Sequence, residues 1–293
     1  MESIKGHLIA LFVMVVWGTT FVSSKVLLDH GLMPDEIFFL RFLQAYLALI
    51  PLCHRRWLAK SWRDELIFLG LGIFGGSAYF LAENTALQFS TTSNVSILVG
   101  STPLVTALLL GAIYKADRLS LKQSLGSVVA FVGMALVVIN GQLVLQLNPL
   151  GDSLALAASL TWAIYSLFMR WISGNYSTLF ITRKVFFYGL VTIVPFMLLS
   201  GHTPQWAHIS QPVVLYNLLY LGLIASSLCY LLWNYVLKVI GTIKATNYIY
   251  MQSFITMLAA KLVLGERITL MAILGVVLLI SGLVILQKNK HKA

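Results

Sequence analysis

Two stretches of this chain, GHLIALFVMVVWGTTFVSSK at residues 6–25 and GDSLALAASLTWAIYSLFMR at residues 151–170, are copies of one pattern. The positions that agree in register include the pairs Gly6/Gly151, Ala10/Ala155, Trp17/Trp162 and Lys25/Arg170. A second pair, which begins at Asp117 with DRLSLKQSLG and at Glu266 with ERITLMAILG, agrees in the same way. We therefore predict two homologous domains, at residues 1–145 and 146–293, an organisation that is typical of secondary transporters.

The composition requires a solvent other than water. Of the 293 residues, 59% are hydrophobic and only 10% are charged, and the mean hydropathy is +0.87. Such a chain lies far outside the averages of soluble domains, and a run of about 20 apolar residues is long enough to cross a bilayer. We expect ten transmembrane helices, at residues 6–28, 34–53, 66–87, 94–114, 121–140, 151–172, 178–200, 213–237, 245–264 and 269–287.

The basic residues gather on one side of these helices. If the N-terminus is cytoplasmic, sixteen of the twenty Lys and Arg residues fall on the cytoplasmic side, and the positive-inside rule places both termini there. Because each half has five helices, an odd number, the second half enters the membrane from the opposite side. The predicted fold is thus an all-α membrane protein of ten transmembrane helices, arranged as two inverted five-helix repeats around a central cavity. The bilayer, and not nucleic acid, accounts for the net charge of +10.

Several of these features resemble the EamA family of the drug/metabolite transporter superfamily, over residues 4 to 287. They are the positions of Trp17-Gly18 and Trp162, the segment YFLAENTALQFSTTSNVSILVGSTPL at residues 79–104, and the acidic-Arg pairs at Asp117 and Glu266. The resemblance implies a ten-helix bundle with a central cavity, and export of small metabolites across the cytoplasmic (inner) membrane of a bacterium. One departure is that the proline common in the fourth helix of each half is present as Pro103 but replaced by Gln252-Ser253 in the second copy.

Aromatic and polar residues near the middle of the expected helices are candidates for a substrate site. Trp17 and Trp162 lie at mid-helix in matching positions, and Pro103 deprives the Val99 carbonyl of its helical partner. Transporter sites form where broken helices and polar groups meet at this depth, although each residue alone has helix packing as its alternative. The expected substrate-binding residues are Trp17, Tyr79, Ser101, Thr102, Trp162, Tyr230, Asn234, Gln252 and Ser253.

Charged residues within the expected helices form a second group. Arg41 and Glu83 are expected at similar depth near the outer boundary, as an ion pair or in a wet outer vestibule, because an isolated charge there is costly. The repeat relates Arg41 to Arg183 and Asn84 to Asn234, whereas Glu83 has no acidic counterpart. Gating, structural and proton-exchanging roles stay open for the pair.

The sequence favours a transporter over an enzyme. It contains no Walker A or G-x-S-x-G motif and no cluster with metal-ligand spacing, so no cofactor or metal is expected. We expect a secondary transporter that works by alternating access and carries a small molecule, with an amino acid or related compound ahead of a cationic drug. An intramembrane enzyme acting on a lipid-linked substrate is the alternative. Proton coupling, and the choice between monomer and homodimer, stay open.

Overall fold

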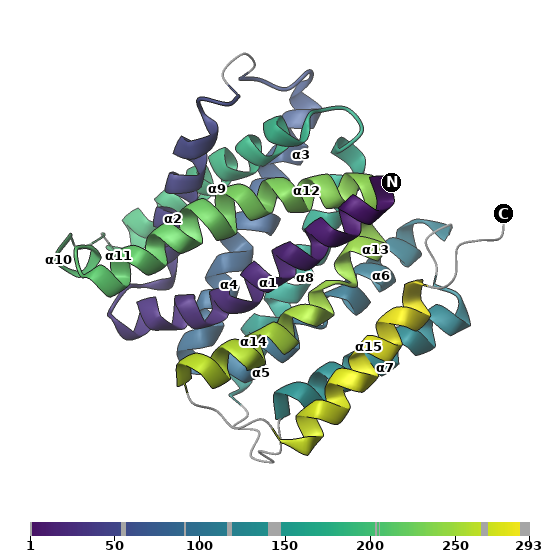
Figure 1. Ribbon diagram of the computed structural model, residues 1–293. Coiled ribbons are helices and arrows are strands. Elements are labelled where there is room, and N and C mark those ends of the chain that lie inside the picture. The colour runs from purple at the N-terminus through teal and green to yellow at the C-terminus, as the bar shows by residue number, and fades with distance from the viewer. Residues whose placement is uncertain are drawn as a thin grey trace.

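The computed structural model describes residues 2–53, 57–90, 92–115, 119–139, 148–202, 204, 206–264 and 269–287, and within these ranges every regular element is a helix (Figure 1). The first half contains α1 (Glu2–Asp29), α2 (Pro34–Leu49), α3 (Trp62–Gly72), η1 (Ile73–Ser77), α4 (Ala78–Phe89), α5 (Thr92–Val99), α6 (Thr102–Ile113) and α7 (Leu121–Ile139). The second half contains α8 (Pro149–Ile172), α9 (Thr178–Ser200), α10 (Trp206–Ile209), α11 (Pro212–Leu219), η3 (Tyr220–Leu228), α12 (Cys229–Ile240), α13 (Thr242–Thr246), α14 (Ile249–Leu264) and α15 (Leu270–Gln287). The predicted all-α class is confirmed.

Each of the ten expected ranges coincides with one helix or with consecutive helical segments. Five of these stretches are long and apolar enough to cross a membrane: Ile4–Asp29, Trp62–Phe89, Pro149–Ile172, Thr178–Ser200 and Pro212–Ile240. Shorter apolar helices occur at Thr102–Ile113, Leu121–Leu136 and Ile273–Gly282. Ten crossings and inverted repeats stay predictions. The pairs Asp117-Arg118 and Glu266-Arg267, and the boundary between the two predicted domains, lie outside the described residues.

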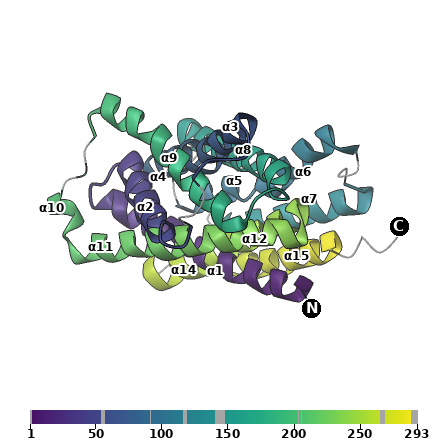
Figure 2. The same cartoon turned by 90° about the horizontal axis from the view of Figure 1, so that it is seen from above.

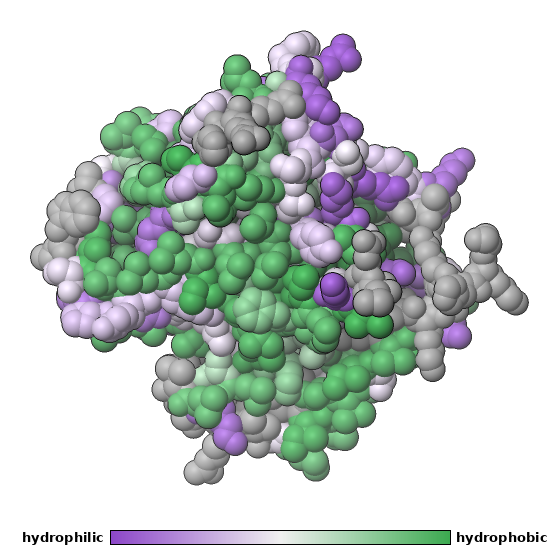
Figure 3. Space-filling view, turned by 45° about the horizontal axis from the view of Figure 1, so that its top comes forward, coloured by the Kyte–Doolittle hydropathy of each residue, from purple (hydrophilic) through white to green (hydrophobic). Residues whose placement is uncertain are grey.

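The outer surface of the bundle is apolar. Leu199, Leu262 and Leu121 are 90%, 84% and 80% exposed, and Figure 3 shows a largely hydrophobic face whose most hydrophilic residues gather mainly at the upper right, with fewer at the left edge. Exposed apolar patches of this extent are unstable in water and mark a surface that contacts lipid. The protein is therefore an integral membrane protein.

The helices form two layers, with the halves of the chain interleaved. Seen from above, α1, α11, α12, α14 and α15 lie in one layer, opposite α3, α4, α8 and α9 (Figure 2). The first helix of each half packs mainly on the other half, since α1 contacts α12 and α14 whereas α8 contacts α4, α5 and α6. This exchange places Trp17 of α1 and Trp162 of α8 at the centre of the bundle.

Helices α7 and α15 pair along one edge of the bundle (Figure 1). Glycines allow their backbones to approach closely: a methyl group added at Gly133 would meet backbone atoms of Leu279, and one added at Gly282 would meet those of Ala130. Small residues at such contacts are usual where helices associate in lipid. The pair thus stands beside the central helices, and none of its described side chains is on the wall of the cavity described below.

The corresponding third membrane stretch of each half contains a π-helical segment. Segment η1 interrupts the stretch Trp62–Phe89, and η3 interrupts Pro212–Ile240. Within η1, Gly76 adopts φ −130° and ψ −105°, which is outside the helical region and marks a kink. A π-helical turn adds a residue to the turn and breaks the regular backbone bonding, so it often occurs at functional sites.

Candidate functional site

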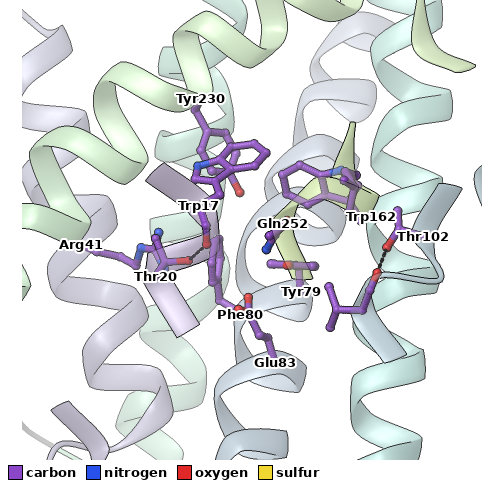
Figure 4. Close-up of a pocket in the computed structure, with 12 residues that line it drawn as sticks. Trp17, Thr20, Arg41, Tyr79, Phe80, Glu83, Thr102, Trp162, Tyr230 and Gln252 are labelled. Carbon is purple, nitrogen blue, oxygen red and sulfur yellow. Dashed lines mark hydrogen bonds between the residues drawn. The ribbon is translucent and has the colours of Figure 1, made fainter. Parts of the chain in front are cut away.

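A cavity with an empty volume of about 410 Å³, which includes space open to solvent, lies among the central helices (Figure 4). The residues on its wall are Trp17, Thr20, Arg41, Tyr79, Phe80, Glu83, Val99 and Thr102 from the first half, and Trp162, Tyr230, Ile249 and Gln252 from the second. A cavity between two homologous halves is where internally repeated transporters place their substrate.

The structure brings together six of the nine residues expected to bind substrate: Trp17, Tyr79, Thr102, Trp162, Tyr230 and Gln252. The other three are not on the cavity wall and bond to neighbouring helices. Ser101 Oγ lies 3.0 Å from Ser159 Oγ on α8, and Ser253 Oγ donates to the Ser96 carbonyl at 3.3 Å. The Asn234 amide donates to Thr182 Oγ1 at 2.9 Å and accepts from the Tyr165 hydroxyl. These three residues hold helices together in this structure.

Aromatic rings make up much of the wall. Trp17 and Trp162, which occupy matching positions in the two copies, meet edge to face with ring centroids 5.4 Å apart. Tyr79 stands 4.9 Å from Trp162, and Tyr230 stands 5.7 Å from Trp17. Edge-to-face rings of this kind pack rigidly and present a flat apolar surface to a ligand. The wall is therefore suited to an apolar group.

Arg41 and Glu83 both line this cavity, and they do not form a close ion pair there. In the described part of the chain, the ion pairs within 4 Å involve Lys25, Lys184 and His202, and none includes Arg41 or Glu83. The Arg41 guanidinium donates through Nε to Ser226 Oγ at 2.9 Å and stacks 4.2 Å from the centroid of the Phe80 ring. Among the described residues, Glu83 Oε2 is buried and has no hydrogen-bond partner. Of the two arrangements expected, an ion pair or a wet vestibule, the structure shows no close ion pair and places both residues on the wall of one cavity.

The two other residues expected to act in gating or ion pairing, Arg183 and Asn84, lie away from the cavity. Arg183 donates to the Cys53 carbonyl and stacks 4.7 Å from the Trp57 ring, at the side of the bundle predicted to be cytoplasmic. The Asn84 amide points to the Pro34 carbonyl, 3.4 Å away, where α2 begins. Both residues connect helices to loops or helix ends, and neither is on the cavity wall.

Each π-helical segment gives a backbone carbonyl to an aromatic residue of the cavity. The Tyr230 hydroxyl donates to the Gly75 carbonyl in η1 at 2.6 Å, and the Trp17 indole Nε1 donates to the Ala225 carbonyl in η3 at 2.9 Å. Buried carbonyls that lack a helical partner need another donor. The distorted segments therefore fix the orientation of two rings on the cavity wall.

The break before Pro103 is satisfied by side chains. Thr102 Oγ1 donates to the Val99 carbonyl at 2.6 Å and lies 3.1 Å from Ser159 Oγ on α8. The Val99 carbonyl, which was expected to lack its helical partner, thus accepts from the neighbouring Thr102 hydroxyl in place of the lost N–H. Thr102 still contributes to the wall. In the second half the chain breaks between α13 and α14, at Asn247-Tyr248, which is before Gln252.

Four further wall residues were not among the expected ones: Thr20, Phe80, Val99 and Ile249. Three of these are three positions away from an expected residue in the sequence. Thr20 follows Trp17, Ile249 precedes Gln252 and Val99 precedes Thr102. Residues three apart share a face of a helix, so this spacing is a signal that could have found them. Phe80 precedes Glu83, another expected site residue, by the same interval, and it also contacts Arg41.

A metal centre finds no support. In the ranges that the structure describes, no three His, Cys, Asp or Glu residues come together as a metal site would need. What the cavity offers is a hydrophobic wall with one basic group, one acidic group and the amide of Gln252.

Relatives of known description are transporters. A probable amino-acid metabolite efflux pump of Salmonella typhimurium is 30% identical over 290 residues, which are 96% of this chain and 94% of the relative. An uncharacterized transporter of Archaeoglobus fulgidus is 26% identical, over 98% of this chain and 99% of the relative. A probable terminal-alkyne amino-acid exporter of Streptantibioticus cattleyicolor is 24% identical, over 94% of this chain and 91% of the relative.

A solved structure and a family model are also similar to this chain. One solved crystal structure, at 15% sequence identity, superimposes with a TM-score of 0.76 over 97% of both chains, which shows a shared fold. The model of the EamA-like transporter family matches residues 4–139 and again residues 149–287. The family and the named relatives point to transport of small metabolites and not to an enzyme. The chain belongs to the EamA-like transporter family.

Proposed function

We propose that this protein is a secondary transporter that moves an amino acid or a related small metabolite across the bacterial cytoplasmic membrane by alternating access, in the direction of export. The observation that carries the proposal is the cavity between the two halves, which takes Trp17 and Tyr79 from the first half and Trp162 and Gln252 from the second. A site shared by two halves changes its access when the halves move relative to each other. The names of two relatives, an efflux pump and an exporter, support export of amino-acid compounds.

The proposed topology has ten crossings in two inverted repeats with both termini in the cytoplasm. Two findings support it. The family model matches the chain twice, once in each half. Helix α1 begins and α15 ends at the same end of the bundle, as an even number of crossings requires (Figures 1 and 2).

Contacts between the halves on the predicted cytoplasmic side support a closed state there. Lys184 Nζ of α9 lies 2.7 Å from Glu65 Oε2 of α3, and the Tyr176 hydroxyl donates to Asp64 Oδ2 at 2.6 Å. The Trp171 indole of α8 donates to the Tyr114 hydroxyl, which follows α6, at 2.5 Å. Opening of this side would separate these partners, so the contacts are expected to stabilise one of the two states of the cycle.

Transport is tested with the purified full chain in proteoliposomes. Vesicles preloaded with a mixture of unlabelled amino acids should accumulate labelled amino acid transiently from outside, because exchange through an alternating site needs no other energy source. A library of other metabolites, offered as competitors, identifies the class that is carried. Export in cells is tested by comparing how fast loaded cells with and without the protein release the same compound.

A further inference from the structure

Two opposite charges on the cavity wall stand near each other without touching. Arg41 comes from α2 and Glu83 from α4, and both face the cavity that the aromatic rings enclose (Figure 4). The two groups interact electrostatically, yet no nitrogen–oxygen distance between them is as short as 4 Å within the described residues. A gap between two opposite charges in a low-dielectric cavity can hold a ligand that carries both charges itself.

One carboxylate oxygen of Glu83, Oε2, has no hydrogen-bond donor among the described residues, although the Tyr79 hydroxyl is near enough to interact with the carboxyl group. The Glu83 side chain is on the cavity wall, and the residue is only 4% exposed. Leaving a buried carboxylate oxygen without a donor costs free energy, more than for a neutral group. A ligand ammonium, with three N–H donors, removes this cost on binding.

Arg41 is held in place so that its charge is presented to the cavity. The residue is 2% exposed, Nε is bound to Ser226 Oγ, and the guanidinium plane lies on the Phe80 ring. These contacts use Nε and one face of the guanidinium, and the side chain reaches toward Thr20 on the cavity wall (Figure 4). The edge of a guanidinium is matched to a carboxylate, which accepts two parallel hydrogen bonds.

The aromatic wall completes the recognition of an apolar substituent. Trp17, Trp162, Tyr79 and Tyr230 surround the space beside the two charges, with ring centroids 4.9 to 5.8 Å apart between neighbours. The Trp162 Nε1 is buried and has no acceptor in the described part of the chain, so the wall also offers one unused donor. A ligand that is only a cation pairs with Glu83 and leaves Arg41 unpaired, and a ligand that is only a carboxylate pairs with Arg41 and leaves Glu83 unpaired.

We propose that the cavity binds a zwitterionic α-amino acid with an apolar side chain, its carboxylate on Arg41, its ammonium on Glu83 and its side chain among the rings of Trp17 and Trp162. This assignment rests on the proposed transport function and specifies the two groups that recognise the substrate. It makes Glu83 a substrate-binding residue, and not a member of a structural ion pair.

Two ligand series test the assignment without any mutation of Arg41. The first contains L-phenylalanine, 3-phenylpropionate, which lacks the ammonium, and phenethylamine, which lacks the carboxylate. The second contains L-leucine, 4-methylpentanoate and 3-methylbutylamine. Binding to the purified full chain is measured by calorimetry and by the fluorescence of the cavity tryptophans. Each zwitterion should bind about ten-fold or more tightly than both truncated relatives, as a charge-assisted hydrogen bond requires. Equal binding of a zwitterion and a truncated relative would overturn the proposal.

The variant Glu83→Gln then separates recognition from other roles of this acid. It should weaken the binding of L-phenylalanine about ten-fold and leave 3-phenylpropionate within about two-fold of the wild type. The matched control is Glu36→Gln, which removes one buried charge outside the cavity and keeps an acceptor for the Met33 N–H at the start of α2. The Glu36→Gln control should bind L-phenylalanine more tightly than 3-phenylpropionate, as the wild type does. This result would show that the weaker binding by Glu83→Gln does not come from general destabilisation.

The remaining outcomes decide between this proposal and the transport function on which it rests. If Glu83→Gln keeps the preference for the zwitterion but loses acceleration by a pH gradient, Glu83 is a proton site and the proposal fails. If the wild type exchanges other metabolites in proteoliposomes but binds neither L-phenylalanine nor L-leucine, the proposal fails and the transport function stands. If folded, reconstituted protein exchanges no compound of the library, the transport function itself fails.

Discussion

The hydroxyl of Tyr230 in the second half donates a 2.6 Å hydrogen bond to the carbonyl of Gly75 in the first half. The relationship is reciprocal, because Trp17 of the first half donates to the Ala225 carbonyl of the second. Each half therefore satisfies a carbonyl in the π-helical segment of the other, and both donors belong to the cavity wall. Movement of one half relative to the other would change the cavity and the two distorted segments together.

The variant Tyr230→Phe tests this connection. It removes one hydroxyl and leaves the Gly75 carbonyl without that donor, so we expect a loss of about 0.5–2 kcal/mol in stability, the range seen for such bonds between helices in membranes. Thermal unfolding of the purified protein in detergent measures this loss of stability. Tyr216→Phe is the control, because Tyr216 is 71% exposed on α11 and should tolerate the change. Equal effects of both variants would show that the bond contributes nothing.

Wall residues should affect transport more than folding. Gln252→Ala removes an amide from the cavity, and we expect exchange in proteoliposomes to fall at least several-fold while membrane expression stays close to normal. Ser253→Ala is the neighbouring control, since Ser253 bonds to the Ser96 carbonyl and is not on the wall. The expectation fails if Gln252→Ala loses folded protein in proportion to its activity, which would identify Gln252 as a packing residue.

The ion pair between Lys184 and Glu65 should stabilise the closed side of the bundle. The side chain of Lys184 is 4% exposed and that of Glu65 is 21% exposed, so Lys184→Met leaves a partly buried carboxylate without its cation and should cost about 1–3 kcal/mol. The double variant Lys184→Met with Glu65→Gln should regain part of this loss in thermal unfolding. Lys25→Met breaks an exposed pair with Asp29 and should change stability by about 0.5 kcal/mol or less. If the double variant is less stable than either single variant, the stability lost in Lys184→Met does not come from breaking this ion pair.

Topology is tested by cysteine labelling in intact cells. In a background with Cys53→Ser and Cys229→Ala, cysteines at Lys60 and Lys122 should be protected from an impermeant thiol reagent, and a cysteine at Gly31 should react. The positive-inside rule assigns the first two positions to the cytoplasm and the third to the opposite side. The reverse pattern would contradict the predicted orientation of the repeats.

The sequence predicted the positions of the helices because each consists of an apolar run between polar breaks, which the bilayer imposes directly. It also predicted six wall residues, because mid-helix depth can be counted along the chain. Depth does not say which face of a helix a residue occupies, so the sequence left open whether Arg41 and Glu83 pair with each other, and the structure places both on the cavity wall. The π-helical segments carry no signal that was read from the sequence, and Tyr230, whose hydroxyl bonds to the Gly75 carbonyl in η1, lies far away in sequence.

Exchange in proteoliposomes tests whether the cavity carries an amino acid across the membrane. Vesicles that contain the purified full chain and an excess of unlabelled L-leucine should accumulate labelled L-leucine transiently above the level of protein-free vesicles, and Trp17→Ala vesicles should accumulate much less. Reconstituted wild-type protein, shown to be folded, that gives no accumulation above protein-free vesicles with L-leucine or any other amino acid would contradict the proposed function.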